Sequence, residues 1–178
     1  MIGLFIGRFQ PFHLGHLDAV RQILEQCDKV IIAVGSSQYK DTCLNPFSFE
    51  ERKEMIEAVL GSVGIDKYDI KAVPDIHDDS MWLEHVEEIV GDYDTAYTGN
   101  PETRSFFEGI RPQVMLKFNI VINATNIRDM IAHDDPSWKN YMHPAAVKVF
   151  LKVGGIERMK KLNCAHGKPK GSSPCNRD

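Results

Sequence analysis

The sequence predicts an α/β fold, with a doubly wound, mostly parallel sheet of about five or six strands, helices on both faces and a small C-terminal helical part. Three observations favour this fold. Short, often β-branched apolar segments alternate with segments of helical periodicity along the chain. That order implies parallel strands joined by right-handed crossovers. The 178 residues, 43% of them hydrophobic, are enough for one domain with its own core.

Five segments are predicted to be strands because they are short, often β-branched and bounded by turn residues. In chain order they cover residues 3–6, 29–34, 69–73, 95–97 and 114–118. Ligands of open parallel sheets bind beyond the carboxyl ends of the strands. The turn that follows the first strand is therefore the first place to search for chemistry.

Two helices are predicted between the first three strands. Leu14, Leu17 and Leu24 fall on one face of the first helix, with polar residues opposite. The second helix begins at the capping box Ser48-Phe49-Glu50-Glu51, in which Ser and Glu side chains satisfy free backbone N–H groups. Glycines within residues 61–64 are expected to end it.

Four further helices are predicted after the third strand. Residues 78–80 offer an N-cap for a helix that closes near Gly91. Asn100 followed by proline is a typical helix start. Residues 123–132 predict a short helix, and residues 144–153 a longer one that two following glycines stop.

The chain is predicted to form one domain over residues 1–163, whose C-terminal part, from about residue 124, is helical. Residues 164–178 contain Gly, Pro, Ser and Lys with almost no apolar groups, which predicts a disordered tail. Residues 148–178 carry a net charge of +6, and residues 1–147 carry −10. Such a basic end is more often a solvated helix face than a nucleic-acid site, so no nucleic-acid partner is predicted.

Several protein classes are excluded by composition. No apolar run approaches the about 18 residues of a membrane span. The start lacks the basic region of a signal peptide, which favours a cytoplasmic protein. The four cysteines form no CxxC pair and are expected to be free thiols. Cys164, His166 and Cys175 match no standard zinc spacing.

The turn after the first strand carries the strongest chemical signal. It has neither of the glycine-rich phosphate-binding fingerprints, GxGxxG and GxxxxGK[ST]. Instead, Gly7 allows close backbone approach and Arg8 supplies a cation. His13 and His16 lie on one face of the first helical turn, beside free backbone N–H groups, and Gly15 leaves room for a ligand. This arrangement predicts a polyphosphate site.

These residues resemble a known family. His13-Leu14-Gly15-His16 resembles the HxGH signature of the nucleotidyltransferase superfamily, whose fold is Rossmann-like and related to that of class I aminoacyl-tRNA synthetases. The whole turn closely resembles archaeal-type nicotinamide-nucleotide adenylyltransferases. Matching pieces follow in the same order: Gly35-Ser36-Ser37-Gln38, Asn45-Pro46-Phe47, Glu51-Arg52, the stretch from Asp75-Ile76 to Trp82, and Gly99-Asn100-Pro101. The resemblance covers roughly residues 2–160.

A second family motif, often written ISGTxxR, matches a segment late in the chain. Thr125 and Arg128 are retained, whereas Asn123 and Ala124 replace the usual serine and small residue. Asparagine is as good an N-cap as serine, so the helix start is preserved. The change leaves open how the triphosphate is held.

The resemblance implies an enzyme that transfers the adenylyl group of ATP to nicotinamide mononucleotide (NMN), giving NAD and pyrophosphate. The acceptor phosphate attacks directly, so the protein supplies positioning and cationic donors rather than a nucleophile. The implied catalytic residues are Arg8, His13, His16 and Arg128, with His16 nearest the α-phosphate. The implied ATP-binding residues are Gly7, Phe9, Gly15, Asn123 and Thr125.

For the acceptor, the resemblance implies that Trp82 stacks on the nicotinamide ring, with Asp79, Asn100 and Arg52 nearby. Each has another interpretation. Trp82 fits a helix core, Asp79 and Asn100 fit helix caps, and Arg52 fits a solvated ion-pair partner.

The implied cofactor is Mg²⁺, bound chiefly by ATP oxygens, with no metal ligand expected from the protein. Relatives of this type often assemble into multimers, so a homo-oligomer is expected. Alternative acceptors are FMN, phosphopantetheine and, with CTP, small phosphoalcohols. A nucleotide-binding sensor without turnover also stays open. If His16 must be charged to donate, activity should fall as the pH rises through its pKa.

Overall fold

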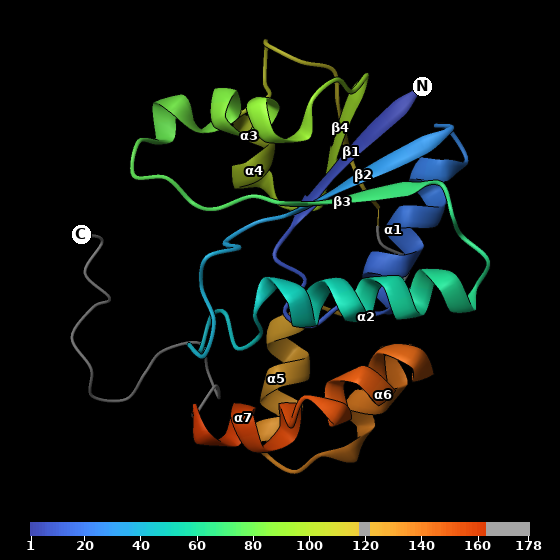
Figure 1. The fold of residues 1–178 in the computed structure, drawn as a ribbon, viewed down its shortest axis with the longest axis vertical. Helices are drawn as coiled ribbons and strands as arrows, with labels where there is room; N and C mark the ends of the chain where they lie inside the picture. The colour runs from blue at the N-terminus through green and yellow to red at the C-terminus, as the bar shows by residue number, and fades with distance from the viewer. Residues whose placement is uncertain (118–121, 163–178) are drawn as a thin grey trace.

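The computed structural model describes residues 1–117 and 122–162. They contain a five-stranded parallel sheet in the order β3-β2-β1-β4-β5 (Figure 1). The strands are β1 (Ile2–Gly7), β2 (Lys29–Val34), β3 (Tyr68–Ala72), β4 (Thr95–Thr98) and β5 (Gln113–Met115). The predicted doubly wound, Rossmann-like fold is confirmed, and the strand order reverses between β1 and β4.

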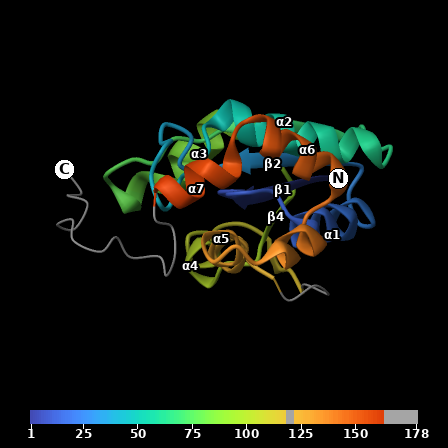
Figure 2. The same ribbon diagram turned by 90° about the horizontal axis from the view of Figure 1, so that it is seen from below.

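The two faces of the sheet are covered by different helices. Figure 2 gives the view from below, in which helices surround the strands. Alternate residues of β2 point to opposite faces. Val30 and Ile32 pack with α1 (Leu14–Leu24) and α2 (Phe49–Ser62), whereas Ile31 packs with α3 (Trp82–Val90) on the other face.

The C-terminal helices form a layer next to α2. They are α5 (Ala124–Ala132), the 3-10 helix η2 (Pro136–Tyr141), α6 (Pro144–Lys152) and α7 (Gly155–Lys161). In Figure 1, α6 lies beside α2 and α7 beside α5, and both pairs are in contact. This layer brings the start of α5 to the carboxyl ends of the strands.

The expected stop at Gly154 and Gly155 is confirmed, because α6 ends at Lys152 just before them, but a further helix, α7, which was not predicted, starts at Gly155. Gly154 adopts a left-handed conformation, with φ of 68°, that turns the chain between α6 and α7. Gly155 faces the ring of Phe150, and a Cβ atom at this position would lie 2.6 Å from it. The two glycines therefore make a tight corner between two packed helices.

Other boundaries differ slightly from the prediction. Helix α2 continues through Gly61 to Ser62, and Gly64 turns the chain at φ of 73°. Asp78 caps a 3-10 helix, η1 (Asp79–Met81), which precedes α3. A short helix, α4 (Pro101–Ser105), follows β4.

The predicted tail, residues 164–178, lies outside the described residues, as do Cys164, His166, Cys175 and the end of the predicted fifth strand. Within the described residues, no helix has both the length and the apolarity needed to cross a membrane.

Candidate active site

A cavity of about 720 Å³ opens at the carboxyl ends of β1, β2 and β4. This volume lies in the range of about 300–1,000 Å³ that is typical of small-molecule sites. Most of the predicted site residues line it: Gly7, Arg8, Phe9, His13, His16, Trp82, Asn100, Asn123, Thr125 and Arg128. Gly15, Arg52 and Asp79 lie outside the lining.

His13 and His16 form one unit at the start of α1. His13 is the N-cap residue and His16 lies three positions later, as in a capping box. The Nδ1 atom of His16 accepts a hydrogen bond from the backbone N–H of His13 at 3.2 Å. The two imidazole rings stack with their centroids 3.6 Å apart. The predicted pairing on one helical turn is confirmed.

Phenylalanine rings surround the imidazole of His16. The Phe9 ring meets it edge-on, with centroids 4.8 Å apart, and the Phe12 ring lies 5.3 Å away. Burial, together with the neighbouring His13, lowers the pKa of His16 well below its ordinary value. The imidazole is therefore neutral at pH 7. Because Nδ1 accepts a hydrogen bond, the ring proton is on Nε2, which can donate to a ligand.

His13 makes the stability of the protein sensitive to acid. Burial lowers the pKa of His13 to about 4, so between pH 6.5 and 4 the unfolded chain gains a proton that the folded protein does not take up. The free energy of unfolding should fall by about 3 kcal/mol from this residue as the pH drops through that window. Urea unfolding across the pH range measures it.

The matched variant is His13→Asn, which keeps an N-capping side chain and removes the titrating group. Its free energy of unfolding should fall less steeply between pH 6.5 and 4. Parallel curves for the two proteins would contradict the assignment of this pH dependence to His13.

Gly7 and Phe9 shape the floor of the first turn. Phe9 has a positive φ of 53° and is 1% exposed, so its ring folds back under the turn. A Cβ atom on Gly7 would lie 3.0 Å from this ring. A side chain at position 7 would therefore crowd the Phe9 ring, and this packing adds a second reason for glycine to the ligand approach expected from the sequence.

The two predicted arginines of the cavity have different surroundings. Arg8 is exposed at the mouth of the first turn. Arg128, on α5, is 4% exposed, and it donates hydrogen bonds to the carbonyl oxygen of Gln10 at 2.9 Å and to the hydroxyl of Thr125 at 2.9 Å. Arg128 thus joins the late motif to the first turn, which are far apart in the sequence.

Asn123 caps α5, as the sequence predicts. Its side-chain oxygen accepts a hydrogen bond from the backbone N–H of Asn126 at 2.8 Å. The helix start therefore forms without serine, and both Asn123 and Ala124 line the cavity. The helix N-terminus beside Arg128 favours the binding of an anion here.

Arg52 lies behind the cavity rather than in it. Its side chain is 0% exposed and donates to the carbonyl oxygens of Arg8, Gly35, Ser36 and Ser48 at 2.8 to 3.2 Å. Burial lowers its pKa to about 10, so it keeps its charge at pH 7. The expected contact with the acceptor does not fit this position, because the guanidinium is used to tie the ends of β1 and β2 to α2.

The acceptor side of the cavity is aromatic. The Trp82 ring lies 4.6 Å from that of Phe106, centroid to centroid, and both line the cavity. Asn100 caps α4 through a hydrogen bond from the Glu102 N–H and also lines the cavity. Asp79 is exposed at the start of η1, whose cap is Asp78, so neither the cap nor a cavity contact falls to Asp79.

Ser36 and Asp75 are cavity residues to which the sequence reasoning assigned no role. The backbone N–H and the hydroxyl of Ser36 donate to the two carboxylate oxygens of Asp75, at 3.1 and 2.8 Å. Both belong to segments that match the family. Ser36 follows β2 and Asp75 follows β3, so their separation in the sequence gives no sign that they pair. Gln10 also lines the cavity, and the partner of its side chain, Phe47, is likewise far away in the sequence.

The side chains of the cavity indicate how a divalent metal ion could be bound. Within residues 1–117 and 122–162, no group of three or more His, Cys, Asp or Glu side chains is arranged to hold a metal ion. The acidic residues of the lining are Asp75 and Glu102. Such a lining fits a divalent cation that arrives with the oxygens of a nucleotide.

Comparisons with known proteins give a consistent picture. The family model described as cytidylyltransferase-like matches residues 4–130. A nicotinamide-nucleotide adenylyltransferase of Thermococcus sibiricus is 38% identical over 167 residues, which are 91% of this chain and 89% of the relative. Its counterpart in Thermoplasma acidophilum is 36% identical over 163 residues, covering 89% of each chain.

Among solved structures, a bifunctional NMN adenylyltransferase/ADP ribose pyrophosphatase from Francisella tularensis, complexed with AMP and a manganese ion, is similar in fold. The TM-score is 0.72 and the identity 29%, over 90% of this chain and 51% of that one. The chain therefore spans about half of that longer protein.

Proposed function

The chain belongs to the cytidylyltransferase-like family, and we propose how its residues carry out adenylyl transfer from ATP to NMN, the reaction that gives NAD and pyrophosphate. The observation that carries the proposal is the cavity, because one space is lined by the cationic turn, the start of α5 and an aromatic pair. ATP lies with its phosphates between the first turn and α5. NMN lies on the side of Trp82.

The reaction is a direct displacement. The phosphate of NMN attacks the α-phosphorus of ATP, a bond to the acceptor oxygen forms, and the bond to the pyrophosphate breaks. Negative charge grows on the α-phosphoryl oxygens and on the leaving group. The Nε2–H of His16 donates to the α-phosphoryl oxygen, and Arg8 and Arg128 bind the phosphates. His13 and the peptide groups of Gly7 and Phe9 complete the phosphate site.

The start of α5 holds the β- and γ-phosphates through Thr125 and the backbone amides after Asn123. Arg52 acts as a positioning residue, because it holds the backbone of Arg8 from below. Gly15 is buried within α1 and supports the turn. Asn100 lines the acceptor end of the cavity, where we propose that it contacts the nicotinamide group. Asp79 lies outside the lining, so it would contact the acceptor only if the start of η1 moved toward the cavity.

A divalent cation, Mg²⁺ in our proposal, binds to the ATP oxygens and supplies further charge neutralisation when present. The Francisella relative, which was solved with manganese, supports a divalent metal. We further propose that the enzyme is cytoplasmic and forms a homo-oligomer, and that residues 1–163 form its nucleotidyltransferase domain. Nucleic acids and membranes are not among its proposed partners.

The decisive experiment is to incubate the purified protein with ATP, Mg²⁺ and one acceptor at a time, and to measure the pyrophosphate released. NMN should give NAD and pyrophosphate in equal amounts, whereas FMN and phosphopantetheine should give none. Tight ATP binding without turnover on any acceptor would instead make the protein a nucleotide sensor.

Trp82→Ala should raise the KM for NMN by about 10-fold or more, because stacking on an aromatic side chain contributes about 1–3 kcal/mol per base. The KM for ATP should change by less than about 2-fold. Steady-state kinetics with each substrate varied in turn would measure both constants.

Trp82→Phe is the matched control, because it keeps an aromatic ring against Phe106. It should recover most of the NMN affinity. Equal increases in the two KM values for Trp82→Ala would contradict stacking and indicate a general collapse of the cavity.

A further inference from the structure

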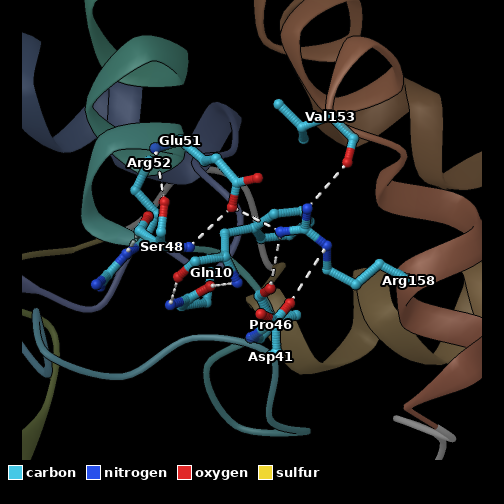
Figure 3. A network of polar contacts seen from close by, with 9 residues as sticks. Gln10, Asp41, Pro46, Ser48, Glu51, Arg52, Val153 and Arg158 are labelled. Atoms are coloured by element: carbon cyan, nitrogen blue, oxygen red, sulfur yellow. Dashed lines mark hydrogen bonds and ion pairs between the residues drawn. The ribbon is translucent and has the colours of Figure 1, made fainter.

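The side chain of Gln10 pairs with a loop on the other side of the first turn. Its amide nitrogen donates to the carbonyl oxygen of Phe47 at 2.9 Å, and its amide oxygen accepts from the Phe47 N–H at 3.0 Å. Gln10 is 2% exposed, so water does not compete for these bonds. Figure 3 shows Gln10 close to Ser48, the N-cap of α2. The pairing fixes the Gln10 backbone relative to Phe47.

The other end of the same residue faces the cavity. The carbonyl oxygen of Gln10 accepts a hydrogen bond from Nη1 of Arg128 at 2.9 Å, and this bond is also buried. The side chain of Gln10 therefore sets the position of the oxygen that holds the guanidinium. A shift of the Gln10 peptide would move Arg128 relative to the phosphates.

Phe47, the partner of the Gln10 side chain, is itself held in place by Arg158. The guanidinium of Arg158, on α7, lies over the Phe47 ring at 5.5 Å from its centroid. Arg158 also donates to the carbonyl oxygen of Pro46 at 3.2 Å and to the carboxylate of Glu51 at 2.6 Å, as Figure 3 shows. Phe47 is thus held against α2 and α7 by contacts that do not involve Gln10.

We propose that Gln10 is a positioning residue, which transmits the fixed position of Phe47 to Arg128 and thereby raises the rate of adenylyl transfer. The inference rests on the proposed role of Arg128 in binding phosphate. Gln10 does not touch the reacting atoms through its amide, because both polar atoms of the amide are bonded to Phe47. Its whole effect on the rate should therefore pass through Arg128.

The chain holds a matched control for this proposal. Gln38 pairs in the same two-point way with the backbone of Asp75, at 3.0 and 2.9 Å, but these bonds are exposed. Gln38 is also absent from the cavity lining. Gln10 and Gln38 therefore make the same kind of amide pairing, but only the Gln10 backbone is bonded to Arg128.

The test is a double-mutant cycle on kcat with the full chain, using Gln10→Ala, Arg128→Ala and the double variant. Gln10→Ala should lower kcat by about 10-fold while changing the KM for ATP by less than about 3-fold. In the Arg128→Ala background, Gln10→Ala should cause less than about 2-fold further loss. Gln38→Ala should leave kcat within about 2-fold of the parent.

Two results would overturn the proposal: equal proportional losses from Gln10→Ala in both backgrounds, or a Gln38→Ala loss as large as that of Gln10→Ala. Gln10→Asn covers the case in which Gln10→Ala does not fold, because it keeps a neutral amide on a shorter arm, and the same cycle applies. Pyrophosphate release by the parent protein is a separate control. If the parent turns over NMN and the cycle is additive, only the role of Gln10 fails.

Discussion

Replacing His16 with alanine is expected to lower kcat by about 10²–10³-fold, the loss seen when one preorganised donor to an anionic transition state is removed. In the proposed mechanism the Nε2–H donor meets the α-phosphoryl oxygen as charge grows on it, so the contact would be stronger in the transition state than in bound ATP. The ATP dissociation constant should rise by less than about 5-fold, because Arg8, Arg128 and the helix starts are proposed to bind the phosphates as well. Single-turnover kinetics and ATP titration measure the two effects.

The same substitution should cost about 1–2 kcal/mol of stability, because it removes the capping contact with the His13 N–H and the packing against Phe9 and Phe12. His16→Gln separates the two roles. Glutamine at this position of a capping box can accept from the same N–H, so stability should return while most of the rate loss remains. A folded His16→Ala protein with nearly normal kcat would remove His16 from the mechanism.

The pH profile follows from the protonation state of His16. Its lowered pKa means that the imidazole is already neutral at pH 7 in the free enzyme, and raising the pH removes no proton from it. The kcat/KM for ATP should therefore stay level between pH 7 and 9, since kcat/KM reports the free enzyme. This differs from the loss expected for a charged donor. A fall of kcat/KM over this range that is absent in His16→Gln would show that the donor is charged.

Arg128→Lys is expected to lower kcat/KM by about 10²-fold although it keeps the positive charge. A lysine side chain has one nitrogen, whereas the guanidinium bonds at once to the Gln10 carbonyl and the Thr125 hydroxyl. In the proposed mechanism it also binds phosphate, which a single ammonium group could not do in the same geometry. The loss should therefore be larger in kcat than in ATP affinity. Steady-state kinetics with ATP varied at saturating NMN measures it.

Arg111→Lys is the control, because Arg111 forms an exposed ion pair with Glu87 and does not line the cavity. It should leave kcat/KM within about 2-fold of the parent. Similar losses in the two variants, or a fully active Arg128→Lys enzyme, would contradict a role for the planar guanidinium.

Most of the fold could be predicted because periodicity and caps act locally. The capping box at Ser48 and the N-cap at Asn123 form as expected, since each needs only residues a few positions apart. Helix α7 was missed because two glycines are a typical stop signal. Only the packing of Gly155 against Phe150, a contact between helices, shows that the chain makes a corner there and continues.

The candidate site was predictable to the extent that its residues lie on two short motifs. His13, His16 and Arg128 reach one cavity because the turn after β1 and the start of α5 meet at the strand ends. The role of Arg52 could not be predicted, because a Glu-Arg pair on a helix gives no sign of burial. Three of its carbonyl partners, Arg8, Gly35 and Ser36, follow strands β1 and β2, and only the folded sheet brings them to α2.

Adjacent residues at the start of α2 hold opposite sides of the molecule. Glu51 bonds to Arg158 of the C-terminal layer, whereas Arg52 bonds to the carbonyls that follow β1 and β2. One helical turn thus couples both halves, which should move as a single rigid body. The separation between His16 and Arg128 is then expected to be the same with and without ATP, so that little of the binding free energy goes into arranging the phosphate side of the cavity.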